Sequence, residues 1–356
     1  MRLMTIALPL AIASPTLAFA QQSQRFTLSS DEVVVYNLVG AVTVEPGSGS
    51  VVVQVTRGGP DAARLTVQQD EMDGRQTLRV RYPEDRVVYG GLDRGSSTEL
   101  RVREDGTFGD GDDHGDGRGW RNDGRRVRIS GAGEGLEAHA DLTVRLPAGK
   151  EAAIYLAVGK VSIANVDGRL HVDAHSAPVT ATGTKGTLRI DVGSGPVQVS
   201  DAEGDVNVDT GSGSVEVSRF RGSSLSIDTG SGDVTGSELE TAELSVDTGS
   251  GEIRLTGVGA PALSLETGSG GIAAELRRDV ASLDVETGSG DIAIRAPASL
   301  GATVEIETSS GDIDTDFPLQ VTRRGRDHVV GTIGDGKGTI EIQTGSGGIR
   351  LLKTQS

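Results

Sequence analysis

Acidic side chains recur at nearly constant intervals through the C-terminal half of this 356-residue chain. Six of them occupy equivalent places in successive sequence repeats and are Asp209, Asp228, Asp247, Glu266, Glu286 and Glu307. Carboxylates at equivalent positions of stacked strands lie about 4.8 Å apart and repel one another. Backbone N–H groups, solvent and counterions, or bound Ca²⁺ are expected to compensate them, so these six residues are candidate calcium ligands.

A second acidic set follows the Gly-Ser-Gly segment of several repeats and comprises Asp233, Glu252, Asp291 and Asp312. A calcium ion needs several oxygen ligands, whereas one repeat supplies a single carboxylate on each side of that segment. Solvated carboxylates on an outer surface are therefore favoured over a ladder of calcium ions. No other cofactor is expected.

Two further constellations could carry chemistry, and a structural explanation is favoured for both. Asp-Thr-Gly-Ser at 209–212 matches the short signature of aspartic proteases, which need two such loops face to face. Here the motif recurs once in each repeat and drifts to Gln-Thr-Gly-Ser at 343–346, as a structural corner would. His171, Asp173 and His175 alternate along one predicted strand and could bind a transition metal, but exposed polar residues are the favoured explanation.

Strict alternation of hydrophobic and polar residues identifies the elements that carry the acidic residues. In the repeat at 225–234, Leu225 and Ile227 share one face of a strand, whereas Ser226 and Asp228 lie on the other. Stacking the repeats aligns hydrophobic residues in one core column, which comprises Val208, Ile227, Val246, Leu265, Val285 and Ile306. The sequence therefore predicts an all-β fold, a single parallel β-solenoid of β-helix or β-roll type with about 19 residues per turn.

The spacing of the repeats breaks once, near the C-terminus. The equivalent residues Ser309 and Gly345 are 36 positions apart, and the interval contains Arg323, Arg324 and Arg326. Because this interval is close to two repeats, it predicts one degenerate turn or a loop.

The chain is predicted to have three parts. Residues 1–20 have the basic start, hydrophobic run and Ala-Phe-Ala cleavage site of a secretory signal peptide. Residues 21–147 contain shorter strand-like runs and are expected to form an N-terminal β region that caps the stack. Within it, the Gly- and Asp-rich segment 104–135 is expected to be a mobile, disordered loop. Residues 148–356 are expected to form the β-solenoid repeat domain, and no membrane span is expected after signal cleavage.

Composition restricts the partners and the chemistry. The chain has 34 basic and 51 acidic residues, a net charge of −17, which argues against nucleic acid as a partner. It has no Cys, so an exported fold must be stable without disulfides. Between Thr187 and Asp316 there is no Lys, His, Trp or Tyr. That stretch lacks the Lys and His that could act beside its carboxylates and the aromatic platforms of a polysaccharide-active β-helix enzyme, so no enzyme is expected.

Three features together resemble the bacterial putative-adhesin family, a domain of unknown function with a β-solenoid fold. They are the exported N-terminal strand region, the segment LTVRLPAGKEAAIYLAVGKVSI at 142–163, and the repeated corners of the type (V/I)-x-(D/E)-T-G-S-G-(D/E)-(V/I). The resemblance implies a non-catalytic envelope or surface protein. That family has no established site residues to carry over.

The sequence therefore favours an exported, non-enzymatic binding or scaffold module of the cell envelope. Its ligand is expected to be an envelope or surface protein or glycan, and its location extracytoplasmic, either periplasmic or secreted to the cell surface. Two alternatives remain open: a polysaccharide-active β-helix enzyme of the lyase or hydrolase type, and a structural spacer stabilised by calcium. The acidic repeats are the expected site for a cation or a cationic partner.

Overall fold

The computed structural model describes residues 22–109, 124–325 and 327–354. Within these ranges the regular elements are 28 strands and one short 3₁₀ helix, η1 (Ala62–Arg64). The predicted all-β class is therefore confirmed. The predicted signal peptide at 1–20 lies outside the described residues.

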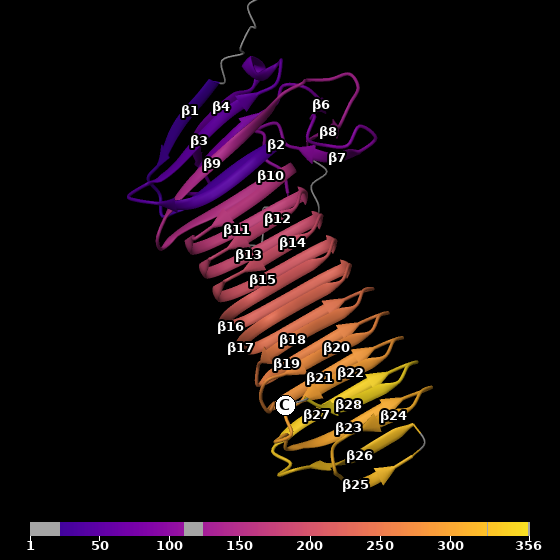
Figure 1. Cartoon of the computed structure of the whole chain (residues 1–356). Coiled ribbons are helices and arrows are strands. Elements are labelled where there is room, and N and C mark those ends of the chain that lie inside the picture. The colour runs from indigo at the N-terminus through magenta and orange to yellow at the C-terminus, as the bar shows by residue number, and fades with distance from the viewer. Residues whose placement is uncertain (1–21, 110–123, 326, 355–356) are drawn as a thin grey trace, which may run out of the picture.

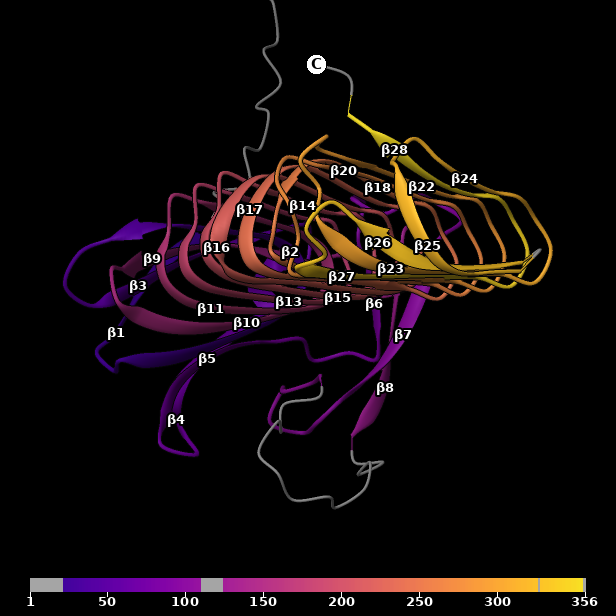
Figure 2. The same ribbon diagram turned by 90° about the horizontal axis from the view of Figure 1, so that it is seen from below.

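Most strands stack in parallel along one elongated body, with the N-terminal strands at one end and β25 and β26 at the other (Figure 1). Viewed along the stack, successive turns lie over one another (Figure 2). Each turn has a first strand, a corner and a second strand. The central strands are β11 (Asp167–Ser176), β12 (Val179–Thr182), β13 (Lys185–Ser194), β14 (Val197–Ser200), β15 (Glu203–Ser212), β16 (Val215–Ser231), β17 (Val234–Thr248), β18 (Ile253–Gly259), β19 (Ala262–Thr267), β20 (Ile272–Leu276), β21 (Ser282–Thr287) and β22 (Ile292–Ala296).

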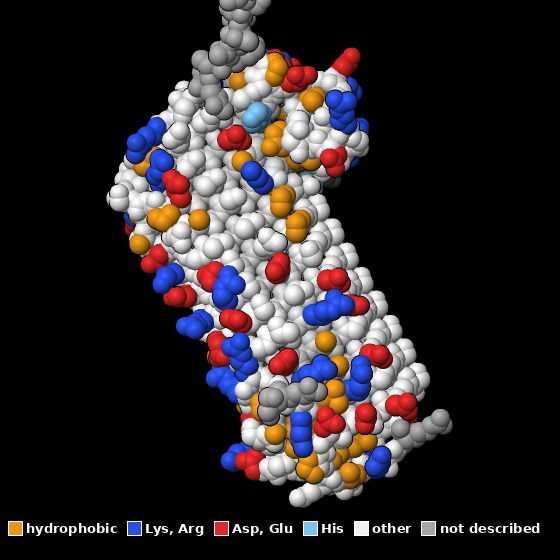
Figure 3. All heavy atoms as spheres, viewed as in Figure 1, with side chains coloured by type: hydrophobic (Ala, Val, Ile, Leu, Met, Phe, Trp, Pro, Cys, Tyr) orange, Lys and Arg blue, Asp and Glu red, His pale blue; other side chains and the backbone are white. Residues whose placement is uncertain are grey.

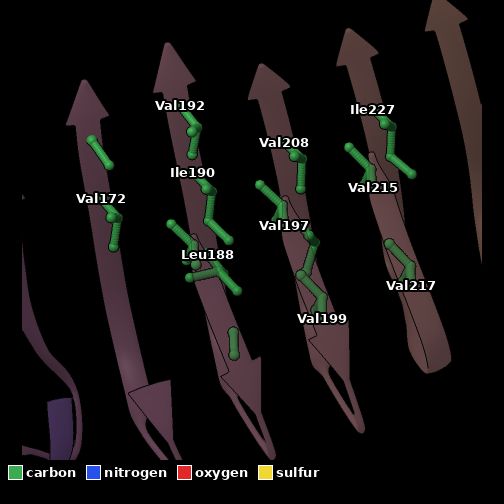
Figure 4. Packing of buried hydrophobic residues seen from close by; sticks show 14 of the residues in the cluster. Val172, Leu188, Ile190, Val192, Val197, Val199, Val208, Val215, Val217 and Ile227 are labelled. Atoms are coloured by element: carbon green, nitrogen blue, oxygen red, sulfur yellow. The ribbon is translucent and has the colours of Figure 1, made fainter. Parts of the chain in front are cut away.

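Alternate side chains of these strands point into one continuous core. Val172, Ile190, Val208 and Ile227 occupy equivalent positions on successive strands, and each is at most 1 % exposed (Figure 4). Burying a side chain of this size contributes about 1.5 to 3 kcal/mol. The stack therefore hides a hydrophobic face that a single repeat would leave in water. The outward positions carry interspersed Lys, Arg, Asp and Glu side chains on the face shown in Figure 3.

The corner between the two strands depends on glycine because neighbouring backbones touch there. A Cβ atom on Gly251 would lie 2.1 Å from the carbonyl oxygen of Gly232, and one on Gly270 would lie 2.0 Å from that of Gly251. Such distances are incompatible with any side chain, so the second glycine of the corner is required by the stacking itself.

The C-terminal strands do not stack in chain order, and this corrects the predicted core column. β27 (Gly338–Thr344) lies between β21 and β23 (Ala302–Thr308), and β28 (Ile349–Lys353) lies between β22 and β24 (Ile313–Thr315). Ile342 therefore separates Val285 from Ile306, which were predicted to be neighbours. The turn made last in the chain is inserted between two turns made earlier.

The interval between Ser309 and Gly345 is neither a degenerate turn nor a plain loop. It contains a hairpin of β25 (Leu319–Arg324) and β26 (His328–Ile333), which pair antiparallel with each other. β26 also pairs antiparallel with β23, so the hairpin covers the edge of the final turn. An antiparallel cover interrupts the parallel ladder and protects its end strand.

The N-terminal region also combines one stacked turn with antiparallel strands. β2 (Glu32–Gly47) pairs in parallel with β10 (Lys150–Ala164), although a long excursion of the chain separates them. On the other edge of β2 lie β5 and β9, which are extended by antiparallel partners. These strands are β1 (Gln22–Leu28), β3 (Val51–Gly58), β4 (Thr66–Met72), β5 (Arg75–Arg81) and β9 (His139–Pro147).

The segment 104–135, predicted to be a disordered loop, is in part ordered. Residues 125–130 form β8 (Arg125–Ser130), which pairs with β6 (Arg86–Val88) and β7 (Ser97–Val102) in a separate small sheet. Phe108 is 3 % exposed and its ring lies 5.7 Å from that of Tyr36, edge to face. The hydrophobic contacts of Phe108, Val127 and Ile129 explain this order. Residues 110–123 lie outside the described residues.

Candidate functional site

Strand register brings acidic residues of successive turns into one line on the outer surface. Asp173 pairs with Asp191, Asp191 with Asp209, and the line continues through Asp228, Asp247, Glu266 and Glu286. We call these seven residues the acidic column. From Asp209 onward its side chains are exposed, because they alternate with core residues on the same strands.

One of the six predicted calcium candidates is separated from the others. Glu286 pairs with Gln343, and Gln343 pairs with Glu307. The inserted turn thus places a neutral amide between two carboxylates that were predicted to be adjacent. The other five candidates, Asp209, Asp228, Asp247, Glu266 and Glu286, are brought together in one unbroken row.

Little positive charge lies near the middle of the acidic column, although Arg189 partly offsets the charge of Asp209. No described residue forms an ion pair with the carboxylates from Asp209 to Glu286. Burial, followed by the charges of Asp191 and Asp228, raises the pKa of Asp209. Burial and Asp228 likewise raise the pKa of Asp247, and the carboxylate of Asp247 is the main cause of a raised pKa at Glu266. Burial is thus the main cause at Asp209 and Asp247, with repulsion between neighbouring carboxylates adding to it, whereas this repulsion is the main cause at Glu266.

At the N-terminal end of the acidic column, neighbouring groups compensate the negative charge of Asp191. Burial opposes ionisation of Asp191, but two hydrogen bonds outweigh it and lower its pKa. One joins Asp191 to His171 Nε2 at 2.9 Å, and the other is donated by Arg189 Nε at 3.0 Å. The negative field of the column therefore begins beyond Asp191.

The predicted transition-metal triad lies on one strand face but does not converge. His171 is bonded to Asp191, and His175 Nε2 lies 2.9 Å from the hydroxyl of Thr98. Burial lowers the pKa of His175. Across the described ranges no three His, Asp or Glu side chains are grouped to hold a metal ion. The calcium assignment of the column stays a prediction.

Two residues of the second acidic set bind the backbone of the adjacent turn. Asp233 Oδ1 accepts a hydrogen bond from the backbone N–H of Glu252 at 2.9 Å, and Asp291 Oδ1 accepts one from Gly348 at 2.8 Å. Each carboxylate satisfies a donor at the corner. At these two residues, the second acidic set therefore links neighbouring turns through hydrogen bonds.

The aromatic start of the column was not anticipated from the sequence. Tyr155 pairs with Asp173 and also with Tyr36, whose ring stacks on that of Tyr155 at 4.4 Å. Asp173 and Asp191 continue nearly the same spacing back from Asp209, so the spacing alone could have extended the column to them. Tyr36 could not be found this way, because a long excursion of the chain separates it from Tyr155.

The comparison with protein families decides the classification. Residues 141–352, well over half of the chain, match the family described as Toastrack DUF4097. The chain belongs to the Toastrack DUF4097 family. The predicted solenoid-like fold agrees with this membership, whereas the Asp-Thr-Gly-Ser-Gly corner as a family signature remains a prediction. No helix among the described residues is long and apolar enough to cross a membrane.

Solved structures similar to this Toastrack chain are distant. A putative lipid binding protein from Parabacteroides distasonis is 12 % identical and covers 95 % of this chain and 98 % of its own, with a TM-score of 0.42. A putative adhesin from the same organism is 12 % identical, with coverages of 94 % and 98 % and a TM-score of 0.36. A putative cell adhesion protein from Clostridium sporogenes is 11 % identical, with coverages of 94 % and 100 % and a TM-score of 0.22. With TM-scores below 0.5, these likenesses assign no ligand. No functionally curated protein matches the chain.

Proposed function

We propose that this Toastrack protein is an exported, non-enzymatic binding or scaffold module of the bacterial cell envelope. The observation that carries the proposal is the row of five carboxylates from Asp209 to Glu286, with which no described residue forms an ion pair. A long, flat and charged surface suits recognition of an extended partner. A catalytic site, by contrast, needs a concave pocket with a few convergent groups.

The same proposal assigns the parts of the chain. Each sequence repeat makes one turn of the solenoid, in keeping with paired residues such as Ile227 and Val246, which are equivalent in successive repeats. Residues 148–356 are the repeat domain and residues 21–147 its N-terminal cap, with residues 1–20 removed on export. The antiparallel strands β3 and β4, which pair with β9 and β5 beyond β2, support the capping role.

The partner is a cationic envelope or surface molecule, either a protein or a glycan. Uncompensated carboxylates attract positive charge, and a partner that neutralises them relieves their repulsion. Its association is expected to weaken as ionic strength rises, because exposed charges are screened over about 10 Å at 0.1 M salt.

Crosslinking in intact cells tests this function. The exported protein is compared with Asp228→Asn/Asp247→Asn, and with the control Glu216→Gln/Asp314→Asn, which removes equal charge on strands beyond the corner. We expect a captured partner to be lost with the first variant and kept with the control. Equal capture by all three proteins would show that the acidic column is not the binding surface.

A calcium-stabilised spacer is the second candidate, because adjacent carboxylates with raised pKa values gain from any bound cation. If calcium bridges Asp209, Asp228, Asp247, Glu266 or Glu286, EDTA is expected to lower the Tm by several degrees, and added CaCl₂ to restore it. Glu307, beside Gln343, is expected to contribute least. An unchanged Tm in EDTA would eliminate the spacer.

A further inference from the structure

The C-terminal end of the stack contains a cavity, lined mainly by hydrophobic residues, that the proposed binding face does not use. The cavity measures about 250 Å³ and lies between the final turn and the β25–β26 hairpin. Except for Thr315 and Arg324, every side chain that lines it is hydrophobic; those of Ile306, Ile313, Phe317 and Leu319 are among them.

The cavity exists because the outermost turn of the stack, made of β23 and β24, has no complete successor. β26 continues the ladder beyond β23. β24 pairs with β28 on one side, and no described strand pairs with it on the other. The hairpin therefore covers inward side chains on the β24 side of the core, such as Ile313 and Leu351, but no further turn fills the space beside them.

The mouth of the cavity combines an exposed hydrophobic residue with a cation. Val321, 43 % exposed, is the one large hydrophobic side chain that is exposed among the described residues. Hydrophobic side chains reach the surface among charged ones near this end of the molecule (Figure 3). Arg324 also lines the cavity, and no carboxylate of the described residues forms an ion pair with it.

A bulge in β25 places Arg324 at the mouth. The pairing of β25 with β26 shifts between Val321 and Arg323, so that Thr322 is the extra residue. Without the shift, Leu319, Val321 and Arg323 would share one face. With it, Arg324 joins Leu319 and Val321 as a lining residue, and Arg323 does not line the cavity. Bulges commonly redirect a side chain in this way.

We propose that this cavity binds a medium-length acyl chain whose carboxylate pairs with Arg324. A cavity of about 150 Å³ holds one benzene molecule, so the volume here has room for roughly ten carbon atoms. The hydrophobic side chains of the walls contact the acyl chain, and the guanidinium of Arg324, which forms no ion pair with a described residue, binds the anionic head. Arg323 and Arg324 on the outer strand of the hairpin disfavour a second copy of this chain as the occupant, because like charges would meet at a strand edge.

Calorimetric titration of the purified full chain with decanoate, kept below its micellar concentration, tests the proposal. Decanol and decyltrimethylammonium are the neutral and cationic comparisons. We expect saturable one-to-one binding of decanoate, weaker binding of decanol and none of the cation. Absence of saturable decanoate binding would overturn the proposal, and so would binding of decanol as tight as that of decanoate.

Two variant pairs locate the site. Arg324→Ala is expected to weaken decanoate binding about tenfold, the effect of losing one charge-assisted hydrogen bond, whereas Arg323→Ala changes it less than about twofold. Val321→Asp is expected to abolish binding and Gln320→Asp to preserve it. All four positions are exposed, so none of these substitutions is expected to disturb the core. An unchanged Tm will show that each variant is folded. Equal effects of Arg323→Ala and Arg324→Ala would contradict the assignment. It would also be contradicted if the protein formed a dimer in solution that decanoate does not dissociate, because the cavity would then be occupied by a second copy of the chain.

Discussion

The corner threonines show how one hydroxyl group can connect two turns. Thr248 Oγ1 donates a hydrogen bond to the carbonyl oxygen of Gly232 at 3.2 Å, and Thr267 does the same to Gly251 at 3.1 Å. Thr229 occupies the equivalent position one turn earlier, but its buried hydroxyl has no partner among the described residues. The same residue type therefore has different energetic roles in neighbouring turns.

This difference predicts that the same substitution changes the free energy of unfolding differently at the two positions. Thr248→Val is expected to lower the free energy of unfolding by about 1 kcal/mol, because it leaves the Gly232 carbonyl without its donor. Thr229→Val is expected to be neutral or stabilising, because it removes a buried hydroxyl that binds nothing. Urea denaturation of the two variants checks this. Equal destabilisation by both would show that the hydroxyl of Thr229 has a partner in solution.

The acidic column predicts an unusual dependence of stability on pH. A carboxyl whose pKa is raised by folding holds its proton longer in the folded chain, so the folded chain binds more protons than the unfolded chain just above the ordinary pKa. For Asp209, Asp247 and Glu266, stability is therefore expected to rise as the pH falls from 7 towards their ordinary values of 3.8 and 4.5. Below those values, protonation of Asp191, whose pKa is lowered, removes stability.

The double variant Asp228→Asn/Asp247→Asn tests this origin. It is expected to be folded, to have a Tm at pH 7 equal to or above that of the parent, and to gain less stability on acidification. Thermal melts between pH 7 and pH 4 provide the measurement, with Glu216→Gln/Asp314→Asn as the control. A large drop in Tm at pH 7 would mean that these carboxylates are ligands or caps.

At the scale of elements, the inserted C-terminal turn can be tested with cysteine pairs, since the chain has no Cys of its own. Glu286→Cys with Gln343→Cys is expected to form a disulfide, because paired strands place these residues about 4.8 Å apart. Glu286→Cys with Glu307→Cys is expected to stay reduced, because two ladder steps of about 4.8 Å exceed the disulfide limit of about 7 Å.

Removing the last turn is expected to reverse the second result. In a chain that ends at Lys337, β23 can pair directly with β21, since Val304 and Ile306 repeat the pattern of Leu283 and Val285. The pair at 286 and 307 would then form a disulfide. Failure to form it in the shortened chain would indicate that β23 is held in place by the hairpin alone.

Stacking order is what sequence reasoning could not supply. Alternation at Leu225 and Ile227 predicts a strand and its buried face, and both are present. Ile306 and Ile342, however, offer the same side chain to the position beside Val285, so the hydrophobic pattern is equally compatible with either neighbour. The choice depends on the hairpin, whose antiparallel pairing has no counterpart in the repeats.

Of the candidate sites, the row of carboxylates could be predicted from the sequence, whereas the cavity could not. Regular spacing identifies the carboxylates from Asp209 to Glu286 as one row, because strand stacking converts a sequence interval into a spatial column. It does not identify the cavity beside Val321 and Arg324. That cavity depends on a bulge and on a missing neighbour of β24, which are properties of one end and not of the repeat.

At the scale of the whole molecule, the two ends follow one plan. Each end has a parallel turn, β2 or β23, whose outer edge carries strands from an excursion of the chain, and each excursion returns to place another turn inside. Among the described residues, neither end presents a complete parallel turn, so end-to-end stacking of one molecule on another is disfavoured.

The position of the last turn also sets the order in which the rod can be completed. Most stacked turns pair with the turn that directly follows them in the chain, so this pairing can propagate from one turn to the next along the chain. β28 instead joins β22 across 57 residues, and β27 enters a slot already bounded on both sides. β27 and β28 are therefore expected to join the stack after their neighbours, and a chain that lacks them is expected to be cleaved more readily by proteases.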